Sequence, residues 1–363
     1  MKAAVSRRPG EKFSIEEVQL ADPIGQEVLI DVKASGLCHS DLHIALEGYG
    51  FEFPTVLGHE AAGVVAKIGP DVTDFAVGDH VVASLIQFCG RCEACLDGRV
   101  YQCWNPGVTQ RGDNEPPRLT QNGEALFQYS AISGFAEQVL VHQNQLSVLP
   151  KEIPFTRAAI LGCGVITGAG AAINSADIHP GQTVAVIGCG GVGLNAIQGA
   201  RLAGAGAVIA IDLQPKKLEL ARRFGATHTI NSGQVDPIEA IHEIAPRGVD
   251  HAFEVIGLKQ TCQLAIDLVR VGGCAYIIGL QKPGNTIELK AWEDLVMGQK
   301  RVIGIQMGST NPKHDIPMFA QLYLDGRFNL DDLVSGEIGL DQINEAYEAL
   351  EGGQIARTII TSF

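Results

Sequence analysis

The chain has 363 residues, of which 46% are apolar and 19% charged, and its net charge is −14. This length favours about two domains, and the composition is that of a globular protein with a sizeable core. The acidic charge argues against nucleic acid or a membrane surface as a partner, because both attract basic patches. No secretory signal and no run of about 18 apolar residues is evident. We therefore expect a cytoplasmic protein, in a compartment where structural disulfides are rare.

The first 150 residues predict a β-rich region. Val- and Ile-rich runs bounded by Gly, Pro or Asp lie at 27–36, 61–69 and 79–86, a pattern that is typical of strands.

Four of the nine cysteines lie close together in "CGRCEACLDGRVYQC", at Cys89, Cys92, Cys95 and Cys103. Four thiolates in one short loop can enclose a tetrahedral Zn²⁺, and such a closed site is structural because no ligand position stays open. A disulfide knot and an iron–sulfur cluster are the alternatives. A reducing compartment disfavours the first, and the common ferredoxin spacings differ from this one. The loop therefore predicts a structural zinc.

The stretch 104–134 is long, polar and rich in Pro and Gly. Loops of this length in compact domains are usually functional or mobile. A tolerated surface insertion is the alternative.

From about residue 180 strands and helices alternate, which predicts a parallel, doubly wound sheet. The tail from about 307 is mixed and ends in a helical stretch at 340–353 and a strand at 356–363. The predicted strands of the alternating part are 183–188, 207–212, 227–231, 250–257, 274–280 and 301–307, and helices are expected at 192–205, 215–225 and 259–273.

A glycine-rich turn joins the first of these strands to its helix. The G-x-G-x-x-G pattern comprises Gly188, Gly190 and Gly193, with Gly191 in addition. These glycines allow a tight turn, close approach of backbone amides to a pyrophosphate and close packing of the helix on the sheet. Asp212 ends the next strand, where its carboxylate can accept ribose hydroxyls and repel a 2′-phosphate, so NAD is favoured over NADP. Lys217 could reach the same ribose.

Three further donors are scattered along the chain. Cys38 lies in "SGLCHSDLH", His59 precedes Glu60 in "LGHEAAGVV", and Cys163 lies in "LGCGVITG". Each alone has an ordinary structural explanation. Together, two thiolates and one imidazole form a zinc set that leaves one position open for water or substrate.

With these motifs in order, the chain resembles the zinc-dependent medium-chain alcohol dehydrogenases over essentially its whole length. The motifs are "GLCHSDLH", "GHEAAG", the four-cysteine loop, "GCGVITG", "GCGGVGLNAI", "GVDHAFEVIG" and "ARTIITSF". The resemblance implies an α/β fold in which a Rossmann domain is inserted into a GroES-like β-rich catalytic domain. The catalytic domain would comprise 1–165 with the structural-zinc lobe and 307–363, the Rossmann domain 166–306, and the active site the cleft between them.

The resemblance also assigns roles around the catalytic zinc. Cys38, His59 and Cys163 become its ligands, with Glu60 as an alternative or transient ligand. Asp41 becomes the carboxylate that orients His59. Ser40 would bind the substrate hydroxyl and pass its proton through the nicotinamide ribose to His43.

Cofactor contacts follow from the same resemblance. Thr167 would abut the nicotinamide, with Val192 behind it, and His39 and Arg357 would contact the pyrophosphate. The remaining expected cofactor residues are Val255, Ile256, Ile278, Leu280, Ile305 and Met307. The implied cofactors are NAD and two zinc ions per chain.

The implied reaction is zinc-assisted hydride transfer between NAD and an alcohol–aldehyde pair. Apolar and aromatic lining at Tyr49, Leu85, Tyr129 and Ser130 would suit a medium-sized primary, allylic or benzylic alcohol. A nicotinoprotein with permanently bound NAD, and a secondary-alcohol or ketone dehydrogenase, are the alternatives.

Two departures from family patterns and one match refine this reading. His39 stands where many relatives carry Arg, which predicts altered NAD release. Glutathione-dependent formaldehyde dehydrogenases carry an acidic residue in place of Tyr49 and an Arg in place of Gly107, so that activity is not expected. The long 104–134 segment matches the long-loop branch, whose members are commonly dimers, and we expect a homodimer.

Overall fold

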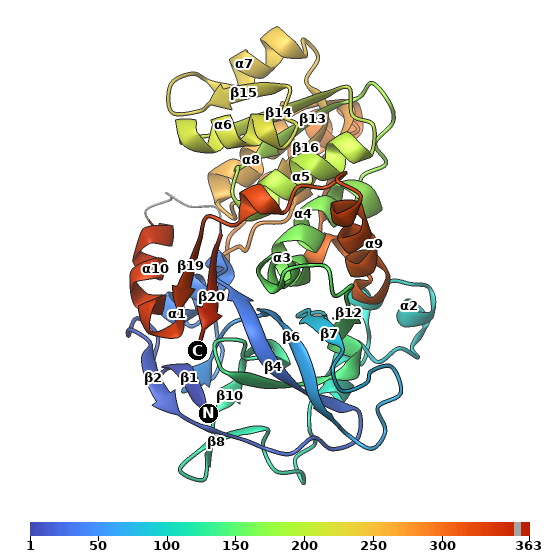
Figure 1. The fold of residues 1–363 in the computed structure, drawn as a ribbon. Coiled ribbons are helices and arrows are strands. Elements are labelled where there is room, and N and C mark those ends of the chain that lie inside the picture. Colours follow the sequence, from blue (N-terminus) through green and yellow to red (C-terminus); the bar gives the residue numbers. More distant parts are fainter. Residues whose placement is uncertain (352–356) are drawn as a thin grey trace. The chain divides into compact units, whose positions relative to one another are not determined.

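The computed structural model describes residues 1–351 and 357–363, and the chain divides into two compact units. The β-rich unit comprises Met1–Cys163 and Asn311–Phe363, and the parallel-sheet unit comprises Gly164–Thr310. Both are drawn in Figure 1. The chain therefore leaves the β-rich unit, forms the second unit as one continuous segment, and returns.

The largest sheet of the β-rich unit has the strand order β12-β7-β6-β4-β20-β19, with β11 also paired to β4. Val28, Ile30 and Val32 alternate into the core from β4, because successive side chains of a strand point to opposite faces. The last strand, β20, pairs with β4, so both ends of the chain build one sheet (Figure 1). Its strands are β4 (Glu27–Gly36), β6 (Glu60–Ile68), β7 (His80–Ala83), β11 (Gln138–His142), β12 (Leu146–Val148), β19 (Gly336–Gly339) and β20 (Thr358–Ser362).

Two smaller sheets complete the β structure, with the orders β10-β5-β1-β2 and β3-β8-β9. Their strands are β1 (Lys2–Ser6), β2 (Ser14–Glu17), β3 (Gln19–Leu20), β5 (Thr55–Val56), β8 (Leu119–Gln121), β9 (Glu124–Ala125) and β10 (Phe127–Gln128). The helices of this unit are α1 (His39–Glu47), α2 (Glu93–Leu96), α3 (Phe155–Ile160), α9 (Pro312–Leu324) and α10 (Ile343–Glu351). Short 3-10 turns are η1 (Val100–Gln102), η2 (Pro106–Thr109), η3 (Tyr129–Ala131), η4 (Gln143–Gln145), η9 (Asp331–Leu333) and η10 (Leu340–Gln342), and the π-helical turn η5 (Leu161–Val165) follows α3.

The parallel-sheet unit contains a six-stranded sheet of order β15-β14-β13-β16-β17-β18, and all its strand pairs are parallel. The chain order reverses between β13 and β16, which makes this the switch point where doubly wound sheets bind ligands. The predicted doubly wound fold is confirmed. Its strands are β13 (Thr183–Ile187), β14 (Ala207–Asp212), β15 (His228–Asn231), β16 (Val249–Glu254), β17 (Val269–Ile277) and β18 (Arg301–Gly304).

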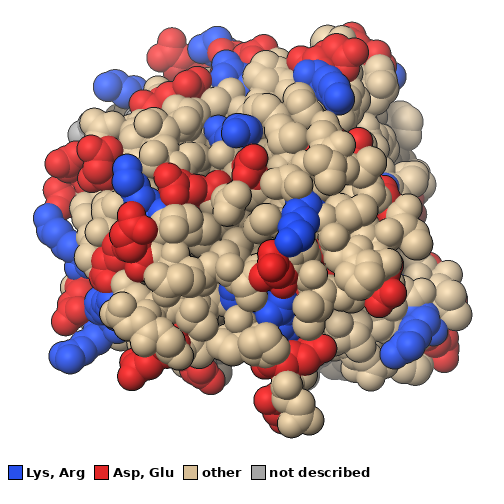
Figure 2. All heavy atoms as spheres, turned by 60° about the horizontal axis from the view of Figure 1, so that its bottom comes forward, with Lys and Arg blue, Asp and Glu red and all other residues tan. Residues whose placement is uncertain are grey.

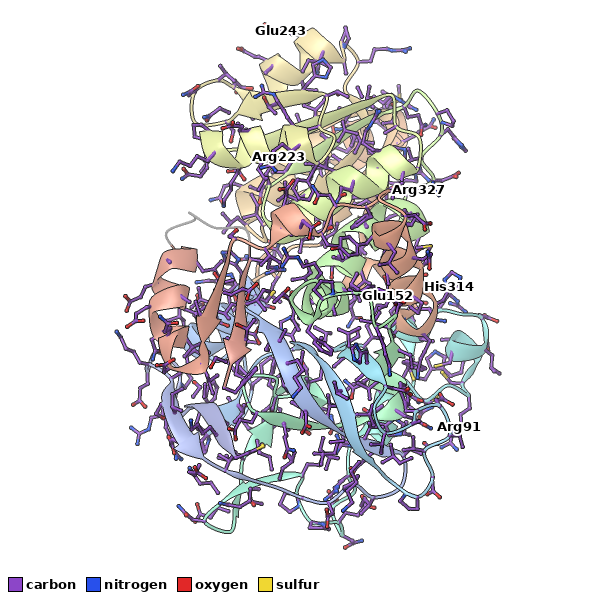
Figure 3. The ribbon with its side chains drawn as sticks, in the orientation of Figure 1. Arg91, Glu152, Arg223, Glu243, His314 and Arg327 are labelled. Carbon is purple, nitrogen blue, oxygen red and sulfur yellow. The ribbon has the colours of Figure 1, made fainter. Side chains whose placement is uncertain are left out.

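Helices connect these strands, as parallel pairing requires. Asp236 caps α7 by accepting hydrogen bonds from the amides of Ile238 and Glu239, and α6 ends in Arg222 and Arg223, whose charges suit a helix C-terminus (Figure 3 labels Arg223). The helices are α4 (Ile166–Gly170), α5 (Gly191–Leu202), α6 (Pro215–Arg223), α7 (Pro237–Ile244) and α8 (Lys259–Leu268), with the π turns η6 (Ala171–Ser175) and η7 (Ala291–Met297) and the 3-10 turn η8 (Met307–Ser309).

Some predicted boundaries were wrong. The helix expected at 259–273 ends at Leu268, because Val269 already pairs with Val249 as the start of β17. The strand expected at 79–86 ends at Ala83. Gly352, Gly353 and Ala356, the outer parts of the predicted terminal helix and strand, lie outside the described residues.

One helical run in the described part of the chain, Phe155–Ser175, is long and apolar enough to cross a membrane. However, 83% of its most apolar window is buried, as in a core helix. The run is therefore no argument for a membrane span.

The surface drawn in Figure 2 carries acidic and basic side chains side by side, with no continuous basic area on that face.

Candidate active site and cofactor site

Four donors meet in the β-rich unit. One ligand atom from each of Cys38, His59, Glu60 and Cys163 lies within 4.8 Å of all the others, and all four residues are buried. The scattered residues singled out in the sequence are therefore brought together by the fold. Two thiols, an imidazole and a carboxylate are a donor set that suits Zn²⁺.

Each donor lies at the end of an element or in an irregular turn. Cys38 precedes α1, whose N-terminus favours a thiolate. His59 directly precedes β6. Cys163 lies in the π-helical turn η5, and a Cβ at Gly162 would lie 2.1 Å from the Ala83 carbonyl oxygen. Only glycine at 162 lets this turn approach β7 so closely.

A buried carboxylate fixes the orientation of His59. Asp41 Oδ1 lies 3.0 Å from His59 Nδ1 and accepts a hydrogen bond from the Gly58 amide at 3.0 Å. Because the Asp41 carboxylate can only accept this hydrogen bond, His59 Nδ1 carries the hydrogen. The other ring nitrogen, Nε2, faces the thiols and lies 3.2 Å from Cys163 Sγ.

Burial and charge shift the pKa values of these groups. Burial raises the pKa of Asp41. Against the effect of burial, the charges of Asp41 and Cys163 raise the pKa of His59. A hydrogen bond with Cys163 and the charges of Arg357 and His59 lower the pKa of Cys38, which favours its thiolate.

Glu60 lies behind the thiols and is paired with a buried arginine. Its Oε1 is 3.1 Å from Arg357 Nη2, and Arg357 Nη1 also donates to the Leu37 carbonyl. Burial raises the pKa of Glu60 to about 7 although Arg357 opposes the shift. A Cβ at Gly36 would lie 2.2 Å from Glu60 Oε2, so this glycine makes room for the carboxylate.

The expected proton-relay residues lie on α1. Ser40 Oγ donates to Cys38 Sγ at 3.2 Å and is 3.5 Å from His59 Nε2, so it adjoins the metal donors. The half-buried His43 ring lies 6.2 Å from the ring of Tyr49. His39, on the same helix, is exposed.

Aromatic rings extend outward from His59. The Tyr129 ring meets His59 edge-on at 5.9 Å, and Phe51 meets Tyr129 edge-on at 5.2 Å. Phe127 lies 6.2 Å from Phe51. Tyr129 is buried, which raises its pKa to about 12, whereas Phe51 is 42% exposed. Tyr129 was expected near the substrate, but the contribution of Phe51 and Phe127 had no signal in the sequence beyond their ring type.

The two other expected pocket residues lie in different settings. Leu85 is half-buried just after β7, and Ser130 occupies the turn that follows Tyr129.

The four-cysteine loop forms a second donor cluster. Sulfur–sulfur distances are 3.4 Å for Cys92–Cys95, 3.9 Å for Cys92–Cys103 and 4.0 Å for Cys89–Cys95. A tetrahedral zinc with Zn–S bonds of about 2.3 Å spaces its sulfurs about 3.8 Å apart, so the cluster fits the ion.

Backbone amides favour the thiolates of Cys89 and Cys92 in this loop, whereas burial raises the pKa of Cys95 and Cys103. The amide of Arg91, labelled in Figure 3, lowers the pKa of Cys89 to about 6, and that of Trp104 lowers the pKa of Cys92. The Cys89 and Asn105 amides donate to Cys103 Sγ. All nine cysteines are free thiols.

In the parallel-sheet unit the expected cofactor residues follow the carboxyl ends of the strands. This edge, at the switch point between β13 and β16, is where such folds bind dinucleotides. Residues 188–193 follow β13, Asp212 ends β14, Val255 and Ile256 follow β16, Ile278 and Leu280 follow β17, and Ile305 and Met307 follow β18.

The glycine turn has the geometry that the motif predicts. Gly188 has φ +100°, which favours glycine, and a Cβ at Gly193 would lie 1.8 Å from the Gly188 carbonyl oxygen. Gly190 precedes α5 with open space around it, and Gly191 and Val192 begin the helix. Backbone amides at this helix start are free to face an anion.

Asp212 also stabilises the backbone of this turn. Its carboxylate accepts hydrogen bonds from the amides of Cys189 and Gln214 at 2.8 and 2.9 Å. The half-buried Lys217 follows on α6.

A buried carboxylate that the sequence did not reveal as functional holds the neighbouring segment. Glu254 Oε1 accepts hydrogen bonds from the amides of Ile256 and Gly257 and from Thr261 Oγ1. Elsewhere in this unit Thr167 Oγ1 donates to Met307 Sδ at 3.5 Å.

Comparison with known proteins identifies the family. Residues 25–151 match the family described as alcohol dehydrogenase GroES-like domain, and residues 191–325 match the zinc-binding dehydrogenase family.

Full-length relatives and solved structures agree. An S-(hydroxymethyl)glutathione dehydrogenase of Escherichia coli O6:H1 is 39% identical over 367 residues, with 99% of both chains covered. A solved alcohol dehydrogenase zinc-binding domain protein from Burkholderia ambifaria is 40% identical with a TM-score of 0.94, covering 100% of this chain and 98% of that one. Benzyl alcohol dehydrogenase from Acinetobacter calcoaceticus is 35% identical with a TM-score of 0.93, covering 100% and 99%.

These matches confirm the predicted family and the GroES-like and Rossmann fold classes. The chain belongs to the zinc-dependent medium-chain alcohol dehydrogenases and is an oxidoreductase acting on CH–OH groups, with NAD and two zinc ions as its cofactors.

Proposed function

We propose that this enzyme oxidises primary alcohols that carry a ring or double bond next to the reacting carbon, with benzylic alcohols as the preferred class. The aromatic series from His59 through Tyr129 to the exposed Phe51 carries this proposal. A planar substrate can meet such rings edge-on or in offset stacks, which adds to the free energy of burial.

The proposed catalytic roles follow from the donor geometry. The catalytic zinc is held by Cys38, His59 and Cys163, with Glu60 as an alternative ligand. The structural zinc is held by Cys89, Cys92, Cys95 and Cys103. When bound, the catalytic zinc supplies a Lewis acid beside the substrate hydroxyl. Asp41 keeps His59 in the required tautomer.

The chain's own hydroxyl and imidazole groups move the proton in this proposal. Ser40 Oγ, 3.5 Å from His59 Nε2, would accept the proton of the substrate hydroxyl and give up its own. With NAD bound, His43, on the same helix, would receive that proton through a hydroxyl of the nicotinamide ribose and release it to solvent.

NAD lies on the parallel-sheet unit in this proposal. Gly188, Gly190, Gly191 and Gly193 approach the pyrophosphate, and Asp212 accepts the ribose hydroxyls with Lys217 nearby. The nicotinamide is surrounded by Thr167, Val192, Val255, Ile256, Ile278, Leu280, Ile305 and Met307. The pyrophosphate is contacted by His39 and Arg357.

A second candidate substrate is S-(hydroxymethyl)glutathione, because relatives at 39% identity carry that name. A glutathione adduct carries two carboxylates and an ammonium group, which bind best to side chains of the opposite charge. Here Tyr49 and Gly107 occupy the two positions where charged residues are expected for that activity. The aromatic rings that pack against His59 favour benzylic alcohols instead.

A substrate panel tests the choice. With the zinc-loaded enzyme and NAD, kcat/KM is measured for benzyl alcohol, cinnamyl alcohol, ethanol, and formaldehyde with glutathione. We expect kcat/KM for benzyl alcohol to exceed that for ethanol by about tenfold or more, because benzyl alcohol buries more carbon atoms. Highest turnover with formaldehyde and glutathione would replace our proposal with the second candidate.

We also propose a homodimer in the cytoplasm. Strand β18 is an edge strand, and exposed apolar side chains gather in and before it, at Trp292, Val296, Met297 and Ile303. An unpaired edge beside an apolar patch is a template for association. None of the nine cysteines forms a disulfide, which suits a reducing compartment.

The oligomeric state can be checked with a charge on the edge strand. Ile303→Lys is expected to convert the dimer to a monomer, because an ammonium group in an apolar interface loses its hydration. Val235→Lys, at a site that is 52% exposed and follows β15 at the opposite edge of the sheet, is the matched control and should stay dimeric. Sedimentation analysis of both variants decides, and a dimeric Ile303→Lys enzyme would exclude the β18 interface.

A further inference from the structure

The backbone that follows Tyr129 is strained. Ser130, Ala131 and Ser133 have φ values of +53°, +56° and +62°. Residues with a Cβ rarely adopt this left-handed region, and three of them fall within four positions. Such strain persists only where surrounding contacts enforce it, and it gathers at functional sites.

Two glutamine side chains supply those contacts. Gln128 Nε2 donates to the carbonyl oxygens of Ile132 at 3.2 Å and Leu140 at 3.0 Å, which ties the turn to β11. The fully buried Gln145 donates through Nε2 to the Ser130 carbonyl at 3.0 Å and to the Ser84 carbonyl at 3.2 Å. Both side chains therefore bridge the strained turn to a neighbouring strand or strand end.

Further hydrogen bonds close the turn on itself and on its neighbours. The amides of Ile132 and Ser133 both donate to the Tyr129 carbonyl oxygen, at 3.0 and 3.2 Å. Ser133 Oγ donates to the Val56 carbonyl at 2.7 Å. The buried Arg118 donates to Gln128 Oε1 at 3.4 Å, which orients that amide.

The turn holds one ring against the metal donors. Tyr129 is its first residue, and the Tyr129 ring lies edge-on to His59 at a centroid distance of 5.9 Å. The Phe51 ring also packs edge-on against Tyr129, at 5.2 Å. A change in the backbone at 130–133 would therefore move the ring that contacts both His59 and Phe51.

We propose that Gln128 and Gln145 are positioning residues for substrate selectivity, because they hold the strained turn that fixes the Tyr129 ring beside the reacting centre. This inference rests on the proposed preference for benzylic alcohols and assigns that preference to the turn. Relaxation of the turn lets the ring move, so ring-bearing substrates lose their fixed partner. Ethanol presents little surface to the ring, so its constants should change little.

The test compares two substrates in matched variants of the full enzyme. Gln128→Met keeps the length of the side chain and removes both donated hydrogen bonds. Its KM for benzyl alcohol is expected to rise about tenfold, as a misplaced positioning group predicts, while kcat and both constants for ethanol stay within about twofold. Gln145→Met removes the hydrogen bond to the Ser130 carbonyl and should likewise raise KM for benzyl alcohol without changing the constants for ethanol. It replaces Gln128→Met as the test if that variant does not fold.

A glutamine outside the turn provides the control. Gln138 lies on β11 and donates to Asp31 Oδ1 at 2.8 Å, so Gln138→Met loses a comparable bond and should leave the benzyl alcohol to ethanol ratio unchanged.

The outcomes separate the two proposals. An equal loss for both alcohols, or an unchanged ratio in both turn variants, would overturn the positioning role while wild-type preference for benzyl alcohol stands. If the wild-type enzyme shows no preference for benzyl alcohol, the proposed function fails. The positioning role is then tested by comparing KM of wild type and the turn variants for straight-chain alcohols from ethanol to hexanol. An unchanged KM across that series would then overturn it.

Discussion

At the scale of the residue, Gly36 shows how little space surrounds the metal donors. A Cβ there would lie 2.2 Å from Glu60 Oε2, and Glu60 is fully buried and paired with Arg357. Gly36→Ala should therefore lower the free energy of unfolding by about 1–3 kcal/mol, the usual cost of overpacking. Urea unfolding and the zinc content of the purified variant measure the effect.

Another glycine of the same sheet separates this clash from the general effect of alanine. Gly336 lies in β19, and no atom would lie within 4 Å of a Cβ added there. Gly336→Ala should be neutral or slightly stabilising. Equal stability of the two variants would show that Glu60 moves aside without cost.

The sequence predicted individual donors better than their surroundings. Cys38, His59 and Cys163 were found because thiols and imidazoles are rare and chemically distinctive, and the structure groups them. The pairing of Arg357 with Glu60 and the packing of Phe51 on Tyr129 were not found. Arginine and phenylalanine have many structural uses, and only tertiary packing decides which partner each one meets.

At the scale of the element, a buried ion-pair cluster anchors the 104–134 segment. Arg111 binds Glu27 through Nε at 2.9 Å and Nη2 at 2.6 Å, and Arg118 Nε binds the same carboxylate at 2.7 Å. The same arginines donate to the carbonyl oxygens of Pro116 and Thr109. The segment therefore contains short strands and fixed turns, not a free loop, and Glu27 at the start of β4 is its anchor.

Removal of the Glu27 carboxylate should lower the free energy of unfolding. Glu27→Gln leaves two buried guanidinium groups without a counter-charge, and the expected loss is about 3–5 kcal/mol of unfolding free energy. Glu16→Gln, which breaks the partly exposed Arg7–Glu16 pair, is the control and should cost less than about 1 kcal/mol. Urea unfolding at neutral pH compares them, and equal losses would contradict the anchoring role.

Element types were easier to predict than their limits. The alternation of strands and helices after residue 180 was evident because each apolar run was bounded by Gly or polar residues. The border between α8 and β17 was missed, since "LVRVGG" has no breaker before Val269. Pairing of Val269 with Val249 on β16 sets that border, and this contact is not local in sequence.

At the scale of the whole molecule, two buried histidines couple stability to pH, one in each unit. Burial and the nearby Arg118 lower the pKa of His142 to about 4, and burial lowers that of His251. His142 Nδ1 accepts a hydrogen bond from the Asn144 amide, and His251 Nε2 is 2.9 Å from Gln182 Oε1. Both rings are therefore held neutral in the folded chain.

The sign of the pH effect follows from these lowered pKa values. Below about pH 6.5 the unfolded chain takes up a proton at each histidine while the folded chain does not, so stability falls as pH falls, until His142 also ionises in the folded state near pH 4. At pH 5 the contribution of His142 to this loss is about 2 kcal/mol. His142→Asn keeps an acceptor for the Asn144 amide and cannot ionise, so its urea midpoint should fall less than that of wild type between pH 7.5 and pH 5. The exposed His228→Asn should follow wild type, and parallel curves for all three proteins would show that His142 does not drive the acid response.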